Sequence, residues 1–288
     1  MSPQRSHIHL RALRLLVGLG LALCLSVCAA GNAQAFNAHG QLLRLAPGRV
    51  MSALPAVNAS QSSNWFGYNQ GALEPGQTLF HSITGSWTVP KASQHKSHEA
   101  EYSSDWIGIG GGCENTSCSV TDSSLIQAGT EQDVGGGGRP SYSAWWEVIP
   151  SPSVPISGMK VRPGDHMHAV IDQVSPGVWK ISIKDLTRHE SYSTTAPYSS
   201  TEGSAEWIEE TPLVLGGNSG FAPLPSLSKG HFDHGTANGH AVKLNRSQEI
   251  ELTSSNGKVV GIPSGPDSDR DGFAACAWAT SCRAPASS

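Results

Sequence analysis

The sequence has few charged side chains and no basic segment. Asp, Glu, Lys and Arg make up 15% of its 288 residues, against about 25% in a typical soluble domain. The 23 acidic residues outnumber the 19 basic ones, and a nucleic-acid partner would need a basic stripe that is absent here. We therefore expect no nucleic-acid binding. A weakly charged surface also accumulates less self-repulsion when carboxylates are protonated, which is compatible with an acidic working environment.

Long apolar runs are absent after the first 35 residues. Those residues hold three arginines, an apolar run over positions 15–30 and a small-x-small site at Ala33-Gln34-Ala35, which is typical of a secretory signal peptide. The run is too short for a membrane span, and no later stretch approaches 18 apolar residues. A lipoprotein would use Cys28, but the residues before it lack the small side chain expected beside a lipidated cysteine. We predict a signal peptide over residues 1–35 and a secreted chain, free of the membrane, with a net charge of about −7.

Cysteine is scarce, and only four cysteines lie beyond the predicted signal peptide. Export makes disulfides the default expectation for them. Four thiols allow three pairings, and the sequence does not choose among them, although the short spacings favour Cys113 with Cys118 and Cys276 with Cys282. Zinc is the alternative, but zinc-ligand pairs are usually spaced more tightly.

The pattern of apolar residues predicts an all-β chain. Short β-type runs separated by turn residues begin near residue 61, and no long amphipathic helix or internal repeat is evident. Residues 178–184 alternate, with Trp179, Ile181 and Ile183 on one face. Asn256-Gly257 suits a tight hairpin, and the run Gly135–Gly138 a flexible loop. Residues 36–60 carry no clear period, so we predict a leader or short pro-segment there and one domain over residues 61–288.

Six short segments follow one another in a distinctive order. They are Asn64–Tyr68, Gly85–Pro90, Trp106–Gly111, Leu125–Gly129, Tyr142–Glu147 and Ala205–Glu210. Their order and content resemble the glutamic peptidases of family G1, also called eqolisins, and most of all the bacterial members, over about residues 62–275. The resemblance implies a concanavalin A-like sandwich of two antiparallel sheets with a concave active-site cleft. It also implies an acid endopeptidase that uses no metal or other cofactor.

The resemblance places the catalytic pair at Gln127 and Glu210. The family's glutamine lies in an Ile-Gln-Ala-Gly strand, and its glutamate is the second acid of an Ala-Glu-Trp-Ile-x-Glu strand. Strand alternation puts Glu206, Ile208 and Glu210 on one face. A carboxylate can take a proton from the attacking water and return it to the leaving amine, while a fixed amide donor stabilises the oxyanion. We predict that Glu210 is the base and then the acid, and that Gln127 is the oxyanion donor and positions the water.

The same resemblance assigns substrate-binding residues. Family members line the cleft with an aromatic residue and an acid two positions apart, which Trp145 and Glu147 match, so that Trp146 points into the core. Trp65 and Trp106 border the cleft in the family. We expect polypeptide substrates and a monomeric enzyme. Taken alone, each residue would also fit an ordinary role as a core tryptophan, a buried amide or a rim carboxylate.

Three positions depart from the family pattern. Gly110 stands where the family often has an aspartate, Ser143 replaces an acid common in fungal members, and Ile149 replaces a cleft tyrosine. These changes bear on subsite preference, pH optimum and residual activity. Two other functions stay open: a carbohydrate-active enzyme or lectin-like sandwich with Glu147 and Glu210 as a carboxylate pair, and a peptide-binding homologue without turnover.

Two groups of possible metal ligands are predicted to bind no metal. Asp267, Asp269, Asp271 and Gly272 match the start of a calcium loop, but its twelfth position is Trp278, which cannot coordinate. We interpret this stretch as a solvated hairpin turn before the last strand. A second group is interpreted as a surface loop because it has no obvious further ligand; it consists of His231, Asp233 and His234.

Overall fold

The computed structural model of the chain describes residues 42–44, 50–51, 59–215 and 220–286. All of these lie in one unit, Asn32–Ser288. The predicted signal peptide and most of the predicted leader lie outside the described residues. Within the described part, no helix has the length and apolar character needed to cross a membrane.

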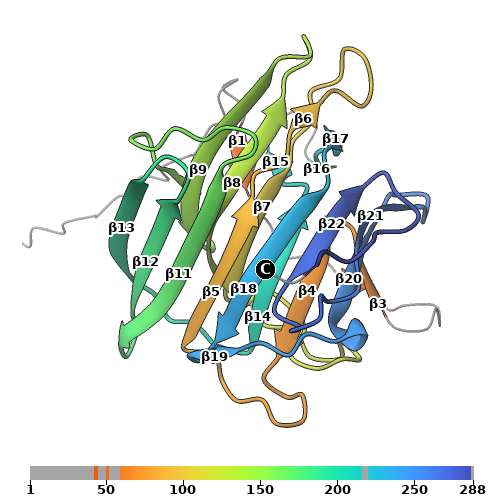
Figure 1. Cartoon of the computed structure of the whole chain (residues 1–288). Helices are drawn as coiled ribbons and strands as arrows, with labels where there is room; N and C mark the ends of the chain where they lie inside the picture. Colours follow the sequence, from red (N-terminus) through yellow and green to blue (C-terminus); the bar gives the residue numbers. More distant parts are fainter. Residues whose placement is uncertain (1–41, 45–49, 52–58, 216–219, 287–288) are drawn as a thin grey trace, which may run out of the picture. The chain divides into compact units, whose positions relative to one another are not determined.

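Two antiparallel sheets form the main body of the described chain (Figure 1). The first, called the site sheet below, carries the segments that resemble the peptidase active site. Its order is β10 (Val154–Pro155), β9 (Pro140–Val148), β8 (Ile126–Val134), β7 (Ser104–Ile109), β14 (Ser204–Glu210), β4 (Trp65–Gly71) and β20 (Glu249–Thr253). Beyond β20, β3 (Ala59–Ser62) pairs in parallel, and β2 (Val50–Met51) pairs with β3.

The second sheet, called the opposite sheet, packs against the first. Its order is β13 (Glu190–Pro197), β12 (Val178–Asp185), β11 (His166–Ser175), β5 (Ser82–Thr88), β18 (Gly230–Ala237), β22 (Phe273–Ala277) and β21 (Val259–Pro263). β21 also pairs with β20, which joins the two sheets along one side. β5 lies against β7 and β11 against β8, so the layers face each other. The predicted two-sheet sandwich is confirmed.

Short elements complete the chain. Two small sheets consist of β1 (Leu42–Arg44), β15 (Leu213–Leu215) and β16 (Gly220–Phe221), and of β6 (Ala92–Ser93) and β17 (Ser226–Leu227). β19 (His240–Ala241) closes a hairpin with β18, and a 3₁₀ turn, η1 (Arg246–Gln248), precedes β20. Asn245 caps that turn in a capping box with Gln248.

Strand alternation gives the site sheet two apolar faces. Successive side chains on a strand point to opposite sides, so Phe66 and Ile107 enter the core between the sheets, while Trp65 and Trp106 enter a separate cluster on the other face. The core between the sheets also holds aromatic residues of the opposite sheet, among them Trp87, Trp179, Phe232 and Phe273. The second cluster consists of Trp65, Trp106, Leu125, Trp145, Ile149, Ile208 and Ile250. It covers the face on which the predicted site lies.

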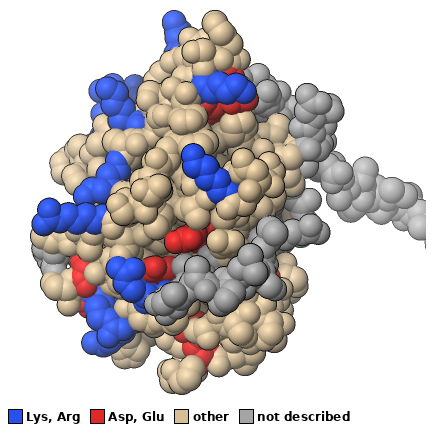
Figure 2. Space-filling model, turned by 90° about the vertical axis from the view of Figure 1, so that its right-hand side faces the viewer, with Lys and Arg blue, Asp and Glu red and all other residues tan. Residues whose placement is uncertain are grey.

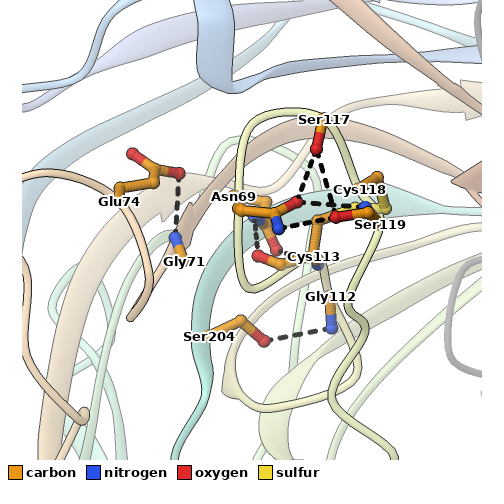
Figure 3. The surroundings of a disulfide bond; sticks show 10 residues. Asn69, Gly71, Glu74, Gly112, Cys113, Ser117, Cys118, Ser119 and Ser204 are labelled. Carbon is orange, nitrogen blue, oxygen red and sulfur yellow. Dashed lines mark hydrogen bonds between the residues drawn. A yellow bond between two sulfur atoms is a disulfide. The ribbon is translucent and has the colours of Figure 1, made fainter.

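Two disulfides have the pairing that the short spacings favour, Cys113 with Cys118 and Cys276 with Cys282. The first lies in the loop between β7 and β8, which leads into the strand of Gln127 (Figure 3). Asn69 of β4 binds this loop from both sides: its amide nitrogen donates to the Cys113 carbonyl at 2.8 Å, and its amide oxygen accepts from the Cys113 N–H at 2.9 Å. The loop is therefore fixed to β4 of the site sheet.

Most local predictions are confirmed. β12 buries Trp179, Ile181 and Ile183, Gly257 has a φ of +78° in the β20–β21 turn, and Gly135–Gly138 form the loop between β8 and β9. One interpretation is wrong: residues 231–234 lie in β18 and not in a loop. There the inward Phe232 alternates with polar neighbours, a pattern too short to read from the sequence. The aperiodic leader also contributes backbone pairing through β1, β2 and β3.

The surface is sparsely charged. On the face drawn in Figure 2, uncharged residues predominate, and the acidic and basic side chains are scattered among them. This arrangement agrees with the low charged fraction of the sequence.

Candidate active site

Gln127 and Glu147 form a hydrogen-bonded pair on the outer face of the site sheet. The two residues are direct partners in the β8–β9 ladder. The Gln127 side-chain amide donates from Nε2 to Glu147 Oε2 at 2.7 Å, and both side chains are fully buried. The Gln127 Oε1 atom accepts no hydrogen bond from the described part of the chain. A carbonyl oxygen in that state is available to a water molecule.

Glu210 lies on the same face, two strands away. It pairs with Ser104 of β7 and Trp65 of β4, and side chains from two other segments donate hydrogen bonds to its carboxylate. Asn64 Nδ2 donates to Oε1 at 3.0 Å, and Trp106 Nε1 donates to Oε2 at 2.8 Å. Burial raises the pKa of Glu210 well above its usual value, the donors oppose this rise, and the Glu147 charge adds to it.

Trp106 connects Glu210 with the strand of Gln127. Its indole nitrogen binds Glu210, while its ring lies over Gly108, the residue paired with Gln127. A Cβ atom at Gly108 would lie 2.9 Å from Cζ3 of Trp106, which is closer than real Cβ contacts. The absence of a side chain at Gly108 therefore lets the indole extend from the glutamate toward the glutamine.

The other two predicted tryptophans pack around this indole. The Trp65 and Trp106 ring centroids are 4.9 Å apart with the planes at 75°, an edge-to-face contact. Trp145 is the ladder partner of Gly129. A Cβ atom at Gly129 would lie only 2.6 Å from the Cβ atom of Trp106, so the glycine leaves room for Trp106. Trp146 packs against the core between the sheets, as the alternation predicts. The six predicted catalytic and substrate-binding residues thus share one face of the site sheet.

The consecutive glutamates Glu209 and Glu210 point to opposite sides of β14. Glu209 enters the interior, where Gln132 Nε2 donates to its Oε1 at 3.1 Å and to Asp105 Oδ2 at 3.2 Å. Burial raises the pKa of Glu209 to about 6. Glu206, on the face of Glu210, lies in the same cross-strand row as Gly108 and Gln127. Burial raises its pKa well above the usual range.

Sequence reasoning missed two residues of the site. Asn64 precedes β4, and the turn at Ser62 orients it: the Ser62 hydroxyl donates to Asn64 Oδ1 at 3.1 Å. No strand period could indicate that direction. Glu131 follows Gln127 by four residues and so shares its face, which is a signal the sequence does carry. It lies in the row of Glu210 and Ser104, and burial raises its pKa to about 7.

The three departures from the family pattern have structural counterparts. Gly110 has a φ of +92°, and a Cβ atom there would lie 2.1 Å from the carbonyl oxygen of Ser124. This backbone has no room for a side chain at residue 110. Ser143 donates from its hydroxyl to Glu131 Oε2 at 3.0 Å, and Ile149 belongs to the outer apolar cluster.

Several solved structures similar to this chain are glutamic peptidases. Scytalidoglutamic peptidase, solved with a peptide-based transition-state analogue, aligns with a TM-score of 0.59 and 21% identity over 75% of this chain and 98% of that one. SCP-B, a member of the eqolisin family solved with the tripeptide Ala-Ile-His, gives 0.55 and 20% over the same shares. Aspergilloglutamic peptidase from Aspergillus niger gives 0.51 and 22%, over 62% of this chain and 99% of that one. The fold is that of the glutamic peptidases.

The sequence comparison identifies the family. The model of the Peptidase A4 family matches residues 63–265, so the chain belongs to that family and is a peptidase, a hydrolase of peptide bonds. No curated protein sequence matches the chain significantly.

Proposed function

We propose that the chain is a secreted acid endopeptidase in which Glu210 and Gln127 act on one water molecule and one scissile carbonyl. The observation that carries the proposal is the position of Trp106, which donates to Glu210 and lies over the residue paired with Gln127. The two disulfides support export, because such bonds persist in oxidising compartments. The peptide-based ligands bound in two similar structures support polypeptide substrates.

The residue types are suited to hydrolysis. Glu210, as a carboxylate, takes a proton from the water as the water attacks the carbonyl carbon, and returns it to the departing amine. The Gln127 amide donates to the oxygen that becomes negative in the tetrahedral intermediate, and its free Oε1 accepts from the water. Glu147 holds the amide in place through the 2.7 Å hydrogen bond. Trp65 and Trp145 supply apolar surface for substrate side chains.

The ionisation of Glu210 sets a condition on this chemistry. A general base must be deprotonated, yet burial raises the pKa of Glu210 well above its usual value. Opening the site to solvent removes the largest cause of the rise and leaves the donors Asn64 and Trp106, which favour the charged form. We infer that the working enzyme exposes this face, and that residues 36–60 are a leader removed on maturation.

The decisive experiment compares the two catalytic substitutions with matched controls. Glu210→Gln and Gln127→Ala should each lower the rate of cleavage of denatured protein at acid pH by about 10²–10³ or more. Glu190→Gln on β13 and Gln77→Ala in a turn, both remote from the site, should leave it unchanged. Circular dichroism checks that all four variants fold. Normal turnover by a folded Glu210→Gln or Gln127→Ala variant would reject the pair.

The same digest separates the remaining alternatives. A carbohydrate enzyme would use Glu147 and Glu210 without the glutamine, but Gln127 binds Glu147 directly. Release of reducing sugars without proteolysis would favour that function. Peptide binding without cleavage over a broad pH range would indicate a homologue that has lost turnover. We propose a monomer with no nucleic-acid partner, which sedimentation of the purified chain would check.

A further inference from the structure

Five possible cation ligands meet at the turn between β21 and β22, on the opposite sheet. One ligand atom each from Asp267, Asp269 and Asp271 lies within 4.8 Å of the others, and the same holds for Asp233, His234 and Asp271. Asp271 belongs to both groups, so the turn and β18 contribute to a single cluster. Phe232 and Phe273, the neighbours of this cluster in β18 and β22, are direct ladder partners and hold the two segments together.

Asp267 directs an unsatisfied oxygen into the cluster. Only 6% of its surface is exposed. Its Oδ1 atom accepts from the backbone N–H groups of Arg270 at 2.8 Å and Gly272 at 3.3 Å. Its Oδ2 atom is buried and has no hydrogen-bond donor within the described part of the chain, and the same is true of Asp271 Oδ1. Buried carboxylate oxygens without a donor are rare, and each requires an explanation.

Oxygen atoms from separate segments converge beside Gly272. The position that a Cβ atom would take there is 2.5 Å from Asp267 Oδ2, 2.7 Å from the Phe232 carbonyl oxygen and 3.0 Å from Asp233 Oδ1. A side chain at residue 272 would collide with all three. The glycine therefore permits carboxylates of the turn and of β18 to approach one another.

The negative charge of this cluster has little local compensation. Arg270 lies within the turn, but its guanidinium donates to the backbone carbonyls of Leu244 at 2.9 Å and Lys243 at 2.8 Å. His234 is exposed, and its Nδ1 lies 3.7 Å from Asp233 Oδ1. Four carboxylates thus face one another at this turn.

We propose that this cluster, formed by Asp267, Asp269, Asp271 and Asp233, is a calcium site. Calcium takes 6–8 oxygen ligands from carboxylates, backbone carbonyls and water, and these residues supply carboxylate oxygens together with the nearby Phe232 carbonyl. The twelfth loop position, Trp278, offers no ligand, and Asp233 brings the further carboxylate from β18. The tip of the turn, residues 268–270, is exposed as predicted, while Asp267 at its start is buried. The ion stabilises the turn against β18 and takes no part in hydrolysis.

Calcium titration of the full chain at pH 7 tests the proposal. After chelator treatment, added Ca²⁺ should raise the thermal unfolding temperature, with half of the effect near 10⁻⁴–10⁻³ M, the range of extracellular calcium modules. Asp271→Asn should weaken the affinity for Ca²⁺ at least about tenfold. A loss of that size is seen even when the residue removed only holds a metal ligand in place. Because this substitution removes a like charge, the calcium-free variant should unfold no earlier than the calcium-free parent chain. Asp172→Asn, on β11 of the same sheet, should leave the calcium response intact.

Three results would overturn the site. They are the absence of any Ca²⁺ response in the unsubstituted chain, an undiminished response in Asp271→Asn, and an equal response to Mg²⁺, which would indicate general charge screening. If Asp271→Asn does not fold, terbium luminescence of the unsubstituted chain provides the second measurement. One Tb³⁺ per chain, displaced by Ca²⁺, supports the site, and the absence of bound Tb³⁺ contradicts it.

Discussion

At the scale of single residues, the catalytic proposal depends on how the Glu210 carboxylate is held. Two of its donors come from outside its own strand, Asn64 from the turn before β4 and Trp106 from β7. Both hydrogen bonds favour the ionised form. They therefore act in the opposite direction to burial, which favours the neutral acid.

Removing either donor should shift the pH dependence of the enzyme. Asn64→Ala and Trp106→Phe each delete one hydrogen bond to the charged form, so the pKa of Glu210 rises and a larger share of the enzyme holds a protonated base in acid. A hydrogen bond to a charged group contributes about 1.5–3 kcal/mol, so kcat/KM on the acidic limb should fall about tenfold or more. A pH profile of kcat/KM measures the displacement of that limb.

The two variants provide their own control. At a pH above the limb, where Glu210 is ionised in every form, Asn64→Ala should regain most of its activity. A loss of the same size at every pH would instead indicate that Asn64 only maintains the structure. Trp106→Phe keeps the aromatic surface against Trp65, so an unchanged profile would mean that the indole N–H has no part in the ionisation.

At the scale of elements, the leader is connected to both segments that flank the site. β1 pairs with β15, which begins three residues after Glu210, and β2 pairs with β3, which ends three residues before Trp65. Meanwhile Gln127 and Glu210 have no exposed surface. A polypeptide substrate cannot contact residues in that state.

A chain that starts at Gln61 should therefore cleave protein faster than one that starts at residue 36. In the longer chain, the form in which Gln127 and Glu210 are buried competes with the form that binds substrate. The rate falls about tenfold for each 1.4 kcal/mol of free energy by which the buried form is favoured. Initial rates on a denatured protein at equal concentrations measure the difference. Far-ultraviolet circular dichroism verifies that the shorter chain folds, and equal rates from two folded chains would show that the leader does not inhibit.

Features within one strand or turn could be predicted from the sequence better than contacts between strands. Alternation in β12, the turn at Gly257 and the face shared by Ile208 and Glu210 could all be predicted, because each depends on residues adjacent along one strand. Contacts between distant segments could not. The Asn64 hydrogen bond depends on a turn, and Asp233 meets Asp271 only because β18 pairs with β22.

At the scale of the whole molecule, buried carboxyl groups make stability depend on pH. Burial raises the pKa of Glu131 to about 7 and that of Glu209 to about 6. It also raises those of Asp105 and Asp133 well above their usual range. The folded state thus binds more protons than the unfolded state between about pH 4, the usual carboxyl pKa, and pH 7. Under the linkage relation, such groups contribute most to stability below this window, and that contribution is lost as the pH rises through it.

The free energy of unfolding should therefore be larger at pH 4 than at pH 7. Denaturant midpoints at the two pH values measure this difference, to which Glu209 alone contributes about 2 kcal/mol. Glu209→Gln keeps an acceptor for Gln132 and removes the titration, so it should reduce the difference, whereas the surface substitution Glu99→Gln should not. A protein that is equally stable at both pH values would contradict the assignment.

Because Glu209 and Glu210 are adjacent, a register error in β14 during folding would exchange their positions. Sliding β14 by a single position would send Glu210 inside and present Glu209 to the indoles, yet it would preserve a nearly complete ladder. Such an isomer would be compact, well bonded and inert. Anchors at both ends of the strand oppose the slip: the Gly110 N–H donates to the Ser204 carbonyl at 2.9 Å, and the Thr211 N–H donates to the Asn64 carbonyl at 2.8 Å. The turn at Gly110 thus also helps to keep the catalytic strand in register.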